Sequence, residues 1–384
     1  MIVLHLVSTL DPAVGGVSQA VRTMIRGLAE LNLRNEVATV DLPTAGYLAG
    51  ETFKTYAMGP AKTPWAYSKN LHLWLQKNLE RYEAVIIHGL WQYQSHCAFK
   101  VWKSLNKKPR LFVMPHGMLD PYFQKAKGRK LKAIRNQLIW HLVEKHLVNN
   151  SNGLLFTCET EKILARVPFQ PYNPISEKVV GLGVEPPPRY NIAMKSSFEK
   201  RLGGNVNNYL LFISRIHEKK GVDLLIRAYI SLKSTNPLLA DLVIAGPGLD
   251  TEYGKQMQQL AGTTKGIHFP GMLTGDAKWG AFYGCDAFIL PSHQENFGIA
   301  VVEALSCGKA VLISDQVNIW REIQEGGSGI VQPDTEQGTF EMLRIWNDLP
   351  HGKKLEMQSK AGSTYIIYFS MPEASRKMAA AIKY

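Results

Sequence analysis

The sequence lacks several features that would place the chain in a special class of protein. No apolar run approaches the ~18 residues needed to cross a membrane, and the apolar stretch at the N-terminus is short and has no basic leader. No metal-ligand spacing joins the four cysteines, which are Cys97, Cys158, Cys285 and Cys307. We therefore expect a reduced, cytoplasmic protein that neither spans a membrane nor is exported.

Length and charge further limit the kinds of protein that the chain can be. At 384 residues the chain exceeds what one hydrophobic core usually supports, so two domains of roughly 150–200 residues are expected. The net charge of +12 is unevenly spread, because residues 100–146 hold twelve Lys or Arg against two Asp or Glu. This excess predicts a local anionic partner, which could be lipid headgroups, a phosphorylated acceptor or nucleic acid. It argues against a uniformly basic nucleic-acid coat.

Three consecutive prolines, Pro186 to Pro188, give the strongest boundary signal. They forbid helix and stiffen the chain into an extended linker, and a polar stretch comes after them. The sequence therefore predicts a first domain at 1–185, a linker at 186–206 and a second domain at 207–365. The remaining segment, 366–384, is expected to be a helix that returns to the first domain.

Short apolar runs alternate with amphipathic stretches in both halves. Strands are predicted in the second half at 209–214, 241–245, 287–290 and 309–313, with helices at 221–232, 251–261, 275–284 and 298–307. The weaker pattern of the first half predicts strands at 2–8, 36–40, 84–88, 111–114 and 154–157. This order indicates βαβ units, hence an α/β fold of two doubly wound Rossmann-like domains facing across a cleft. Ligands of such sheets bind outside the carboxyl ends of the strands.

Two cations come after the first predicted strand of the second half. Arg215 and Lys220 lie between the end of that strand and the start of a helix. The free N–H groups and dipole of a helix start favour anions, so the added cations would make a pyrophosphate site. The alternative is an ordinary exposed basic loop, and the position at the carboxyl end of a strand favours the site.

Two glutamates separated by seven residues give a sharper signal. Glu295 is expected in the loop after a buried strand, and Glu303 on the next helix. Apolar residues surround Glu303, so an ionised carboxylate there is costly unless it is hydrogen-bonded. Ribose hydroxyls could supply two such bonds. The alternative is a solvent-exposed helix glutamate.

Together these motifs resemble the family-4, or group 1, glycosyltransferases of the GT-B fold. In the second half the resemblance rests on Arg215 with Lys220-Gly221, Gly246-Pro247-Gly248, Phe269-Pro270-Gly271 and the segment from Glu295 to Glu303, in an order that holds over about 100 residues. In the first half it rests on Gly15-Gly16-Val17 and on Pro115 to Pro121. The run from His116 to Pro121 is similar to a subgroup that builds bacterial surface polysaccharides.

The resemblance implies a retaining transferase that moves a hexosyl unit from a UDP- or GDP-sugar to a glycan or lipid-linked glycan acceptor, in polysaccharide biosynthesis. Arg215 and Lys220 would neutralise the donor diphosphate. Glu295 would face the transferred sugar and Glu303 would bind the ribose. The other donor-binding positions would be Gly15 and Gly16 beside the phosphates, Gly246 and Pro270 beside the base, and the backbone amides of Asn296, Phe297 and Gly298 near sugar and phosphate.

Two histidines lie at the carboxyl ends of predicted strands in the first half. One follows its strand and the other is the last residue of its strand. His116 comes directly after the strand at 111–114. It could hydrogen-bond the transferred sugar or stabilise charge in the transition state. The resemblance implies that it is catalytic, together with Arg215, Lys220 and Glu295. His88 could shape the acceptor pocket. For both, the alternative is a capped or partly buried loop histidine.

The chain contains no Asp-x-Asp, the carboxylate pair by which other glycosyltransferases hold a divalent ion. Neither a metal nor another cofactor is therefore expected. The charge of the leaving group would be met by Arg215, Lys220 and helix N-termini.

The segment 125–142 combines a helical apolar stripe with basic residues. The stripe is Leu131, Ile134, Leu138 and Leu142, and the cations around it are Lys125, Lys127, Arg129, Lys130, Lys132 and Arg135. This pattern is typical of a helix on the anionic surface of a membrane, here the inner face of the cell membrane. It fits equally a cleft-lining helix whose stripe packs on its own domain. A nucleic-acid partner is not expected.

Two rival functions stay open at this point. A GT-B enzyme could epimerise or hydrolyse its sugar nucleotide without an acceptor. A non-catalytic basic module for RNA or acidic membrane would bind without turnover, and it would leave Glu303 without a role.

Overall fold

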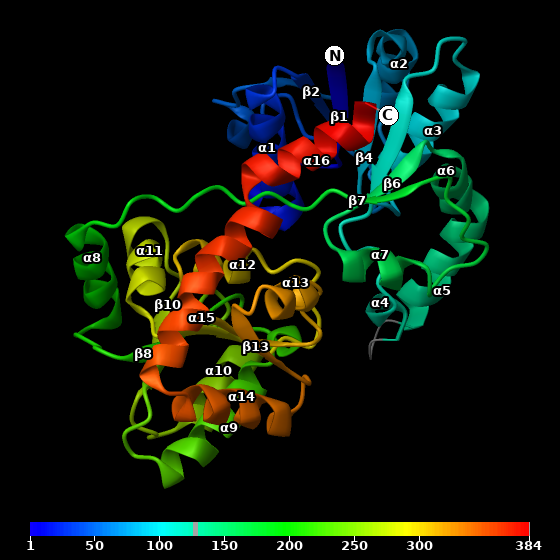
Figure 1. Ribbon diagram of the computed structural model, residues 1–384. Coiled ribbons are helices and arrows are strands. Elements are labelled where there is room, and N and C mark those ends of the chain that lie inside the picture. The colour runs from blue at the N-terminus through cyan, green and yellow to red at the C-terminus, as the bar shows by residue number, and fades with distance from the viewer. Residues whose placement is uncertain (126–129, 384) are drawn as a thin grey trace. The chain divides into compact units, whose positions relative to one another are not determined.

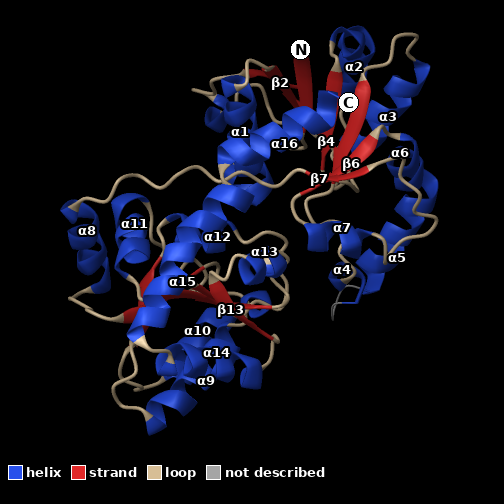
Figure 2. Ribbon diagram, in the orientation of Figure 1, coloured by secondary structure: helices blue, strands red, loops and turns tan. Residues whose placement is uncertain are grey.

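The computed structural model describes residues 1–125 and 130–383, which form two compact α/β units. Unit 1 comprises Met1–Gly183 and the described residues from Met371 onward, and unit 2 comprises Val184–Ser370. In each unit one parallel sheet lies between layers of helices (Figures 1 and 2). The prediction of two doubly wound Rossmann-like sheets is confirmed.

The sheet of unit 1 is parallel throughout, in the order β3-β2-β1-β4-β5-β6-β7. Its strands are β1 (Ile2–Leu6), β2 (Arg34–Thr39), β3 (Lys54–Ala57), β4 (Ala84–His88), β5 (Arg110–Met114), β6 (Gly153–Phe156) and β7 (Glu177–Val179). The order reverses between β1 and β4, so the loops after these two strands lead to opposite sides of the sheet. Such a switch point leaves a crevice for ligands.

Helices cover both faces of this sheet. They are α1 (Gly16–Glu30), α2 (Lys69–Asn78), α3 (Tyr93–Ser104), α4 (Tyr122–Lys125), α5 (Lys130–Ile139), α6 (Lys145–Asn150), α7 (Glu159–Ala165) and α16 (Met371–Lys383), with a π-helix at Trp140–Glu144 and short 3-10 turns at Pro12–Val14, Gly46–Leu48 and Leu79–Arg81. Buried side chains on one face include Leu4, Leu6 and Val85, and those on the other include Val21 and Val37.

Helix α16 packs against α1 (Figure 1). Gly27 of α1 allows the close approach, because a Cβ there would collide with the side chain of Ser375. This helix lies in the segment that the sequence pattern predicts to return to the first domain.

The six-stranded sheet of unit 2 is also parallel, in the order β10-β9-β8-β11-β12-β13. Its strands are β8 (Tyr209–Ile213), β9 (Asp241–Ala245), β10 (Ile267–Gly271), β11 (Ala287–Leu290), β12 (Val311–Ser314) and β13 (Gly329–Gln332). The order reverses between β8 and β11, which makes this pair the switch point of unit 2.

Two layers of helices enclose the sheet of unit 2, with α9, α10 and α14 below it and α8, α11, α12 and α15 above it in Figure 1. The bounds are α8 (Ile192–Leu202), α9 (Val222–Thr235), α10 (Glu252–Ala261), α11 (Gly275–Gly284), α12 (Ile299–Ser306), α13 (Trp320–Glu325), α14 (Glu336–Asp348) and α15 (His351–Thr364), with a 3-10 turn at Glu218–Lys220 and a π-helix at Tyr365–Phe369. No helix among the described residues is long and apolar enough to cross a membrane.

The segment expected as a linker, 186–206, differs from the prediction. Only its first residues are extended, and α8 then packs on α11 as part of unit 2. Met194 and Phe198 bury one face of α8, and the side chain of Asn191 caps its start. Gly280 of α11 lets the two helices touch, because a Cβ there would collide with the carbonyl oxygen of Met194. The prolines make the start of this segment extended, but the helix after them forms because it has an apolar face to bury.

Candidate functional site

The switch point of unit 2 brings Lys220 and Glu295 together. Lys220 ends the loop after β8, Glu295 lies in the loop after β11, and the Lys220 ammonium donates to Glu295 Oε2 as an ion pair. The Lys220 side chain is only 8% exposed and that of Glu295 is 24% exposed. Burial alone would raise the pKa of Glu295, but the charge and hydrogen bond of Lys220 outweigh it and lower that pKa. The Glu295 carboxylate is therefore ionised near neutral pH.

Backbone contacts lock the two loops to each other. His293 N and Ser292 Oγ both donate to the carbonyl oxygen of Lys219, each at 2.9 Å. Gly221 has a φ of 65°, and a Cβ there would collide with the carbonyl oxygen of Pro291. Only glycine fits where these two loops touch. The Lys220–Glu295 ion pair is therefore held by two loops whose backbones are fixed to each other.

Arg215 lies in the same loop as Lys220 but has a different environment. Its side chain is exposed, and it forms no ion pair with any residue in the described ranges. The neighbouring backbone is fixed, because Ile216 N donates to the Pro247 carbonyl at 2.8 Å. The sequence pattern assigns Arg215 and Lys220 to one anion, whereas in the structure Glu295 already neutralises Lys220. Arg215 is the cation with an uncompensated charge.

Glu303, the second glutamate of the motif, also has a cationic partner. Lys278 of α11 donates to Glu303 Oε1 at 2.6 Å, and the carboxylate side chain is 13% exposed. Sequence reasoning missed Lys278, because the helix turn around Glu303 is apolar and the partner comes from another helix. Within the described chain Glu303 Oε2 accepts no hydrogen bond, so one oxygen remains for a ligand.

The remaining residues predicted to bind the donor lie along the carboxyl edge of the same sheet. Gly298 has a φ of 77° at the N-cap of α12, Phe297 is buried against Phe369, and Asn296 is half-buried. Gly246 comes directly after β9, and a Cβ on it would collide with the carbonyl oxygen of Ser214. Pro270 lies in β10, whose last residue, Gly271, accepts from Gly246 N at 2.9 Å. Unit 2 thus gathers its predicted site residues at one sheet edge.

Unit 1 carries the other predicted residues at its own switch point. Gly15 ends the loop after β1 with a φ of 139° and caps α1, which begins at Gly16. Both glycines are exposed, and a Cβ on Gly15 would meet no atom. Glycine is therefore favoured at position 15 by the positive φ of its backbone, and not by lack of space for a side chain. His88 ends β4, and His116 lies in the loop after the neighbouring strand β5.

Three histidines of unit 1 form a continuous hydrogen-bonded row. His5 Nδ1 lies 3.0 Å from His88 Nε2, and His88 Nδ1 lies 2.9 Å from His116 Nε2. At the inner end His5 Nε2 lies 3.1 Å from Asn35 Oδ1. Sequence reasoning identified His88 and His116 singly but missed His5 and Asn35. A weak signal existed, since both are polar residues within or beside predicted apolar strands.

A buried carboxylate holds the loop that carries His116. Glu161 accepts from Gly117 N at 2.6 Å and from Thr157 N at 2.7 Å. His116 has a φ of 53°, a conformation that non-glycine residues seldom adopt. Glu161 therefore stabilises the backbone geometry that directs His116 toward His88.

Burial keeps this histidine row neutral. It lowers the pKa of His5 to about 4 and that of His116 to about 4. Burial and the neighbouring histidines His116 and His5 lower the pKa of His88 well below its ordinary value. At physiological pH none of the three rings carries a charge.

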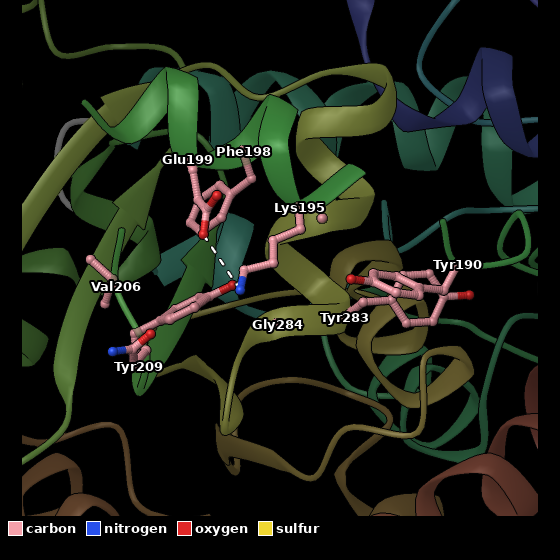
Figure 3. A pocket seen from close by; sticks show the side chains of 10 residues that line it. Tyr190, Lys195, Phe198, Glu199, Val206, Tyr209, Tyr283 and Gly284 are labelled. Carbon is pink, nitrogen blue, oxygen red and sulfur yellow. Dashed lines mark ion pairs between the residues drawn. The ribbon is translucent and has the colours of Figure 1, made fainter. Parts of the chain in front are cut away.

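A well-formed cavity of unit 2 lies away from these residues. It has a volume of about 460 Å³ and lies between α8 and α11, at the amino end of β8, where Tyr209 begins the strand. Figure 3 shows Lys195 and Glu199, one turn apart on α8, paired along its wall, and Tyr190 beside Tyr283. This is the edge of the sheet opposite to Lys220, so the cavity is separate from the candidate site.

The stripe on α5 and the following π-helix is exposed. Leu131, Ile134, Leu138 and Leu142 are 84%, 60%, 59% and 75% exposed, respectively. The alternative that the stripe packs on its own domain is therefore wrong. The predicted cations Lys127 and Arg129 lie outside the described residues, whereas Lys130 and Lys132 are exposed on α5 and Arg135 lies on the same helix.

Comparison with known proteins places these observations in a family context. Residues 195–345 match the family model of the glycosyl transferases group 1. An uncharacterized glycosyltransferase of Methanocaldococcus jannaschii is 29% identical over 137 residues, covering 35% of each chain. The D-inositol 3-phosphate glycosyltransferase of Stackebrandtia nassauensis is 28% identical over 199 residues, covering 49% of this chain and 44% of that protein. The chain spans about a third of the length of the curated relatives it matches.

Solved structures match the whole chain. Sucrose-phosphate synthase from Thermosynechococcus elongatus has a TM-score of 0.71 at 15% identity, over 100% of this chain and 98% of that one. HepE of Anabaena, in complex with UDP-glucose, has a TM-score of 0.71 at 17% identity, over 100% and 99%. The fold is that of the GT-B glycosyltransferases, and the similarity to the group 1 family model lies within unit 2.

The neutral histidine row predicts a specific loss of stability in mild acid. The ordinary pKa of histidine is 6.5, and those of His5 and His116 in the folded state are about 4. Between these values the unfolded chain binds protons that the folded chain does not, so the free energy of unfolding falls as pH falls. Each such histidine contributes about 1.4 kcal/mol per pH unit. Urea unfolding of unit 1 at pH 7.5, 6 and 5 measures the slope.

His88→Gln should reduce this slope by about 1.4 kcal/mol per pH unit, since it removes one of the three rings. Replacing the exposed His351 by Gln is the control and should leave the slope of the wild type. Equal slopes for all three proteins would show that the row is protonated or accessible in the folded state.

Proposed function

We propose that the chain is a GT-B glycosyltransferase that transfers a hexosyl unit, with retention, from a UDP- or GDP-sugar to a glycan or lipid-linked glycan acceptor. The observation that carries the proposal is the set of charged residues at the β8–β11 switch point, inside the segment that matches the group 1 family model. A parallel sheet binds its ligand at such a point. Solved complexes of a structural neighbour with UDP and UDP-glucose support a nucleotide-sugar donor.

The charges of unit 2 suit the two parts of a sugar nucleotide differently. Arg215, which is exposed and unneutralised within the described chain, would bind the diphosphate, together with the first-turn amides of α12. Lys220 would share its protons between Glu295 and a phosphate oxygen. Glu295, held ionised, would accept hydrogen bonds from sugar hydroxyls, and Glu303 Oε2 would accept them from the ribose.

We propose a front-face transfer for the chemistry. The bond from the anomeric carbon to the phosphate oxygen breaks while the acceptor oxygen bonds to that carbon on the same face, and the acceptor proton passes to the leaving phosphate. The protein would position the reactants and stabilise the developing charge. Arg215 and Lys220 are the cations for that charge.

We propose that no divalent ion takes part. The sequence contains no Asp-x-Asp, and the described residues contain no group of three or more His, Cys, Asp or Glu arranged to hold a metal ion. Arg215 and Lys220 would then be the side chains that meet the charge of the diphosphate.

We also propose that α5 and the following π-helix bind an anionic membrane surface, which suits a lipid-linked acceptor and a polysaccharide pathway. Four large apolar side chains are exposed in a helical stripe, and Lys130, Lys132 and Arg135 flank it. Burying the stripe in the acyl region while the cations meet anionic headgroups satisfies both halves of the pattern.

Replacing the cations of the switch point should weaken donor binding. Arg215→Ala is expected to lower the affinity for the bare nucleoside diphosphate about tenfold or more, because it removes a charge-assisted contact. Lys220→Ala should lower transfer at least as much. Calorimetry with UDP and GDP, and a transfer assay, measure these effects, with the exposed Lys255→Ala as the charge-matched control.

The double variant Lys220→Ala with Glu295→Gln tests why Lys220 matters. If Lys220 binds phosphate, the double variant should fold as stably as the wild type but bind the bare nucleoside diphosphate at least about tenfold more weakly than Glu295→Gln alone. Equal affinity of the double variant and Glu295→Gln for the bare diphosphate would mean that Lys220 only neutralises Glu295, and the diphosphate assignment of Lys220 would be wrong.

Chelation should leave activity unchanged. Transfer measured with excess EDTA is expected to equal transfer without it, because the phosphate charge is met by side chains and backbone amides. A loss of activity that magnesium or manganese restores would reveal a metal site and contradict the proposal.

Glu303 and Glu295 should separate in binding experiments. Glu303→Ala should weaken binding of the bare nucleoside diphosphate and of the full donor alike, because ribose is present in both. Glu295→Ala should weaken only the full donor. Calorimetric titration with UDP and UDP-glucose, or with the GDP pair, decides the matter, and Lys278→Met controls for loss of the Glu303 partner. The opposite pattern would reverse the two assignments.

Charge reversal on α5 should weaken membrane binding. Lys130→Glu with Lys132→Glu is expected to cost about 1 kcal/mol per residue on liposomes that contain phosphatidylserine, and the effect should fade at high salt. Lys107→Glu with Lys108→Glu makes the same charge change in unit 1 away from α5 and should cost less. Equal losses in sedimentation assays would assign the binding to overall charge, and no binding by the wild type would refute the membrane proposal.

A further inference from the structure

The histidine row of unit 1 has a defined direction, and one residue sets it. Asn35 Nδ2 donates to the carbonyl oxygen of Leu33 at 2.8 Å. A carbonyl oxygen only accepts, so the amide nitrogen must face Leu33 and the amide oxygen must face His5. Asn35 Oδ1 therefore accepts, and the proton between Asn35 and His5 belongs to His5 Nε2.

The rest of the row is fixed by the chemistry of a neutral imidazole, which has one N–H donor and one bare acceptor nitrogen. With its proton on Nε2, His5 must accept at Nδ1, so His88 donates from Nε2. His88 must then accept at Nδ1, so His116 donates from Nε2. The outcome is a bare Nδ1 on His116.

The open end of the row is accessible to a ligand. His116 is half-buried, and its Nδ1 makes no hydrogen bond with the part of the chain that the structure describes. Asn35 and the other two histidines are buried, with exposures of 7%, 0% and 2% for Asn35, His5 and His88. Solvent protons therefore reach the row from the His116 end. The direction in which its hydrogen bonds run is set at the other end, by Asn35.

We propose that Asn35, His5 and His88 are positioning residues that hold His116 in the Nε2–H tautomer, so that its Nδ1 accepts a hydrogen bond from a substrate hydroxyl. The proposal rests on the proposed transferase function for the identity of the ligand, but not for the tautomer. It excludes the alternative role of His116, to steady negative charge, because a neutral ring with a bare nitrogen toward the ligand cannot stabilise a phosphate oxygen.

The alternatives to this polarity are disfavoured by the same contacts. Reversing the row would place a proton on His116 Nδ1 and leave bare His5 Nε2 facing Asn35 Oδ1, two acceptors 3.1 Å apart with no proton between them. Protonating any ring would charge a buried group, and burial holds the pKa of His5 and His116 near 4. The Nε2–H tautomer is thus the state that satisfies every hydrogen bond of the row.

Nitrogen NMR of the full-length protein labelled with ¹⁵N-histidine tests the tautomer directly, since protonated and bare ring nitrogens have well-separated shifts. At pH 7.5 without ligand, the three rings should each show a protonated Nε2 and a bare Nδ1. A protonated Nδ1 on His116 in the wild type would overturn the proposal. This measurement needs no donor, so it stands even if the proposed function fails.

Asn35→Leu removes the residue that sets the direction. With no acceptor beside His5 Nε2, the row should reverse or mix, and a protonated Nδ1 signal should appear for His116. Ile25→Val is the control, since Ile25 is a buried apolar residue of the same unit and should lower stability without changing any tautomer. Unchanged tautomers in Asn35→Leu would show that Asn35 does not set the polarity, and a reversal in Ile25→Val would show that loosened packing alone suffices.

Binding connects the tautomer to the substrate. With Nδ1 protonated, the sugar hydroxyl can no longer donate to His116 and must turn to accept instead, away from the orientation it has in the wild type. The affinity for UDP-glucose relative to UDP, or for GDP-mannose relative to GDP, should therefore fall about 3- to 10-fold in Asn35→Leu, while affinity for the bare diphosphate stays constant. An unchanged ratio in a variant whose tautomers have reversed would refute the role toward substrate. If neither sugar nucleotide binds the wild type, the proposed function is wrong, and the spectra still decide the polarity of the row.

Discussion

Each unit depends on one geometric constraint, the right-handed crossover between parallel strands. A sheet that is wound in both directions must contain one neighbouring pair of strands whose following loops leave toward opposite faces. In unit 2 that pair is β8 and β11, and in unit 1 it is β1 and β4. Polar and charged residues that lie far apart in sequence meet at these two places, because the diverging loops leave the carboxyl ends of the buried strands uncovered there.

The sequence predicts the framework well because the strands at the centre of each sheet are buried on both faces. Such strands appear as continuous apolar runs, as 84–88 and 287–290 do. Edge strands such as β3 and β7 are only partly buried and give no such run, so they are missed. Helix α8 is missed for another reason. The prolines before it predict an extended linker, and only Met194 and Phe198 mark its buried face.

The site is predictable only as far as its residues are close in sequence. The glutamate pair and the loop from Arg215 to Lys220 are visible, because a single turn or helix places their members. The partners Lys278 of Glu303 and Glu295 of Lys220 are 25 and 75 residues away and come from other elements. A single sequence carries no signal for such pairing. This pairing changes the predicted chemistry. Lys220 appears as a free cation in the sequence, but Glu295 neutralises it in the fold.

The ordered row of imidazoles also acts through its electric field. Each neutral ring is a dipole that points from its bare nitrogen toward its N–H, and three rings joined head to tail add their dipoles, as peptide groups do along a helix. The positive pole of the row is buried at Asn35, and the negative pole emerges at His116 Nδ1. The switch point of unit 1 therefore presents a partial negative charge that attracts polarised O–H groups and repels anions, whereas Arg215 in unit 2 does the reverse. The two units therefore carry opposite electrostatic preferences at the carboxyl ends of their sheets.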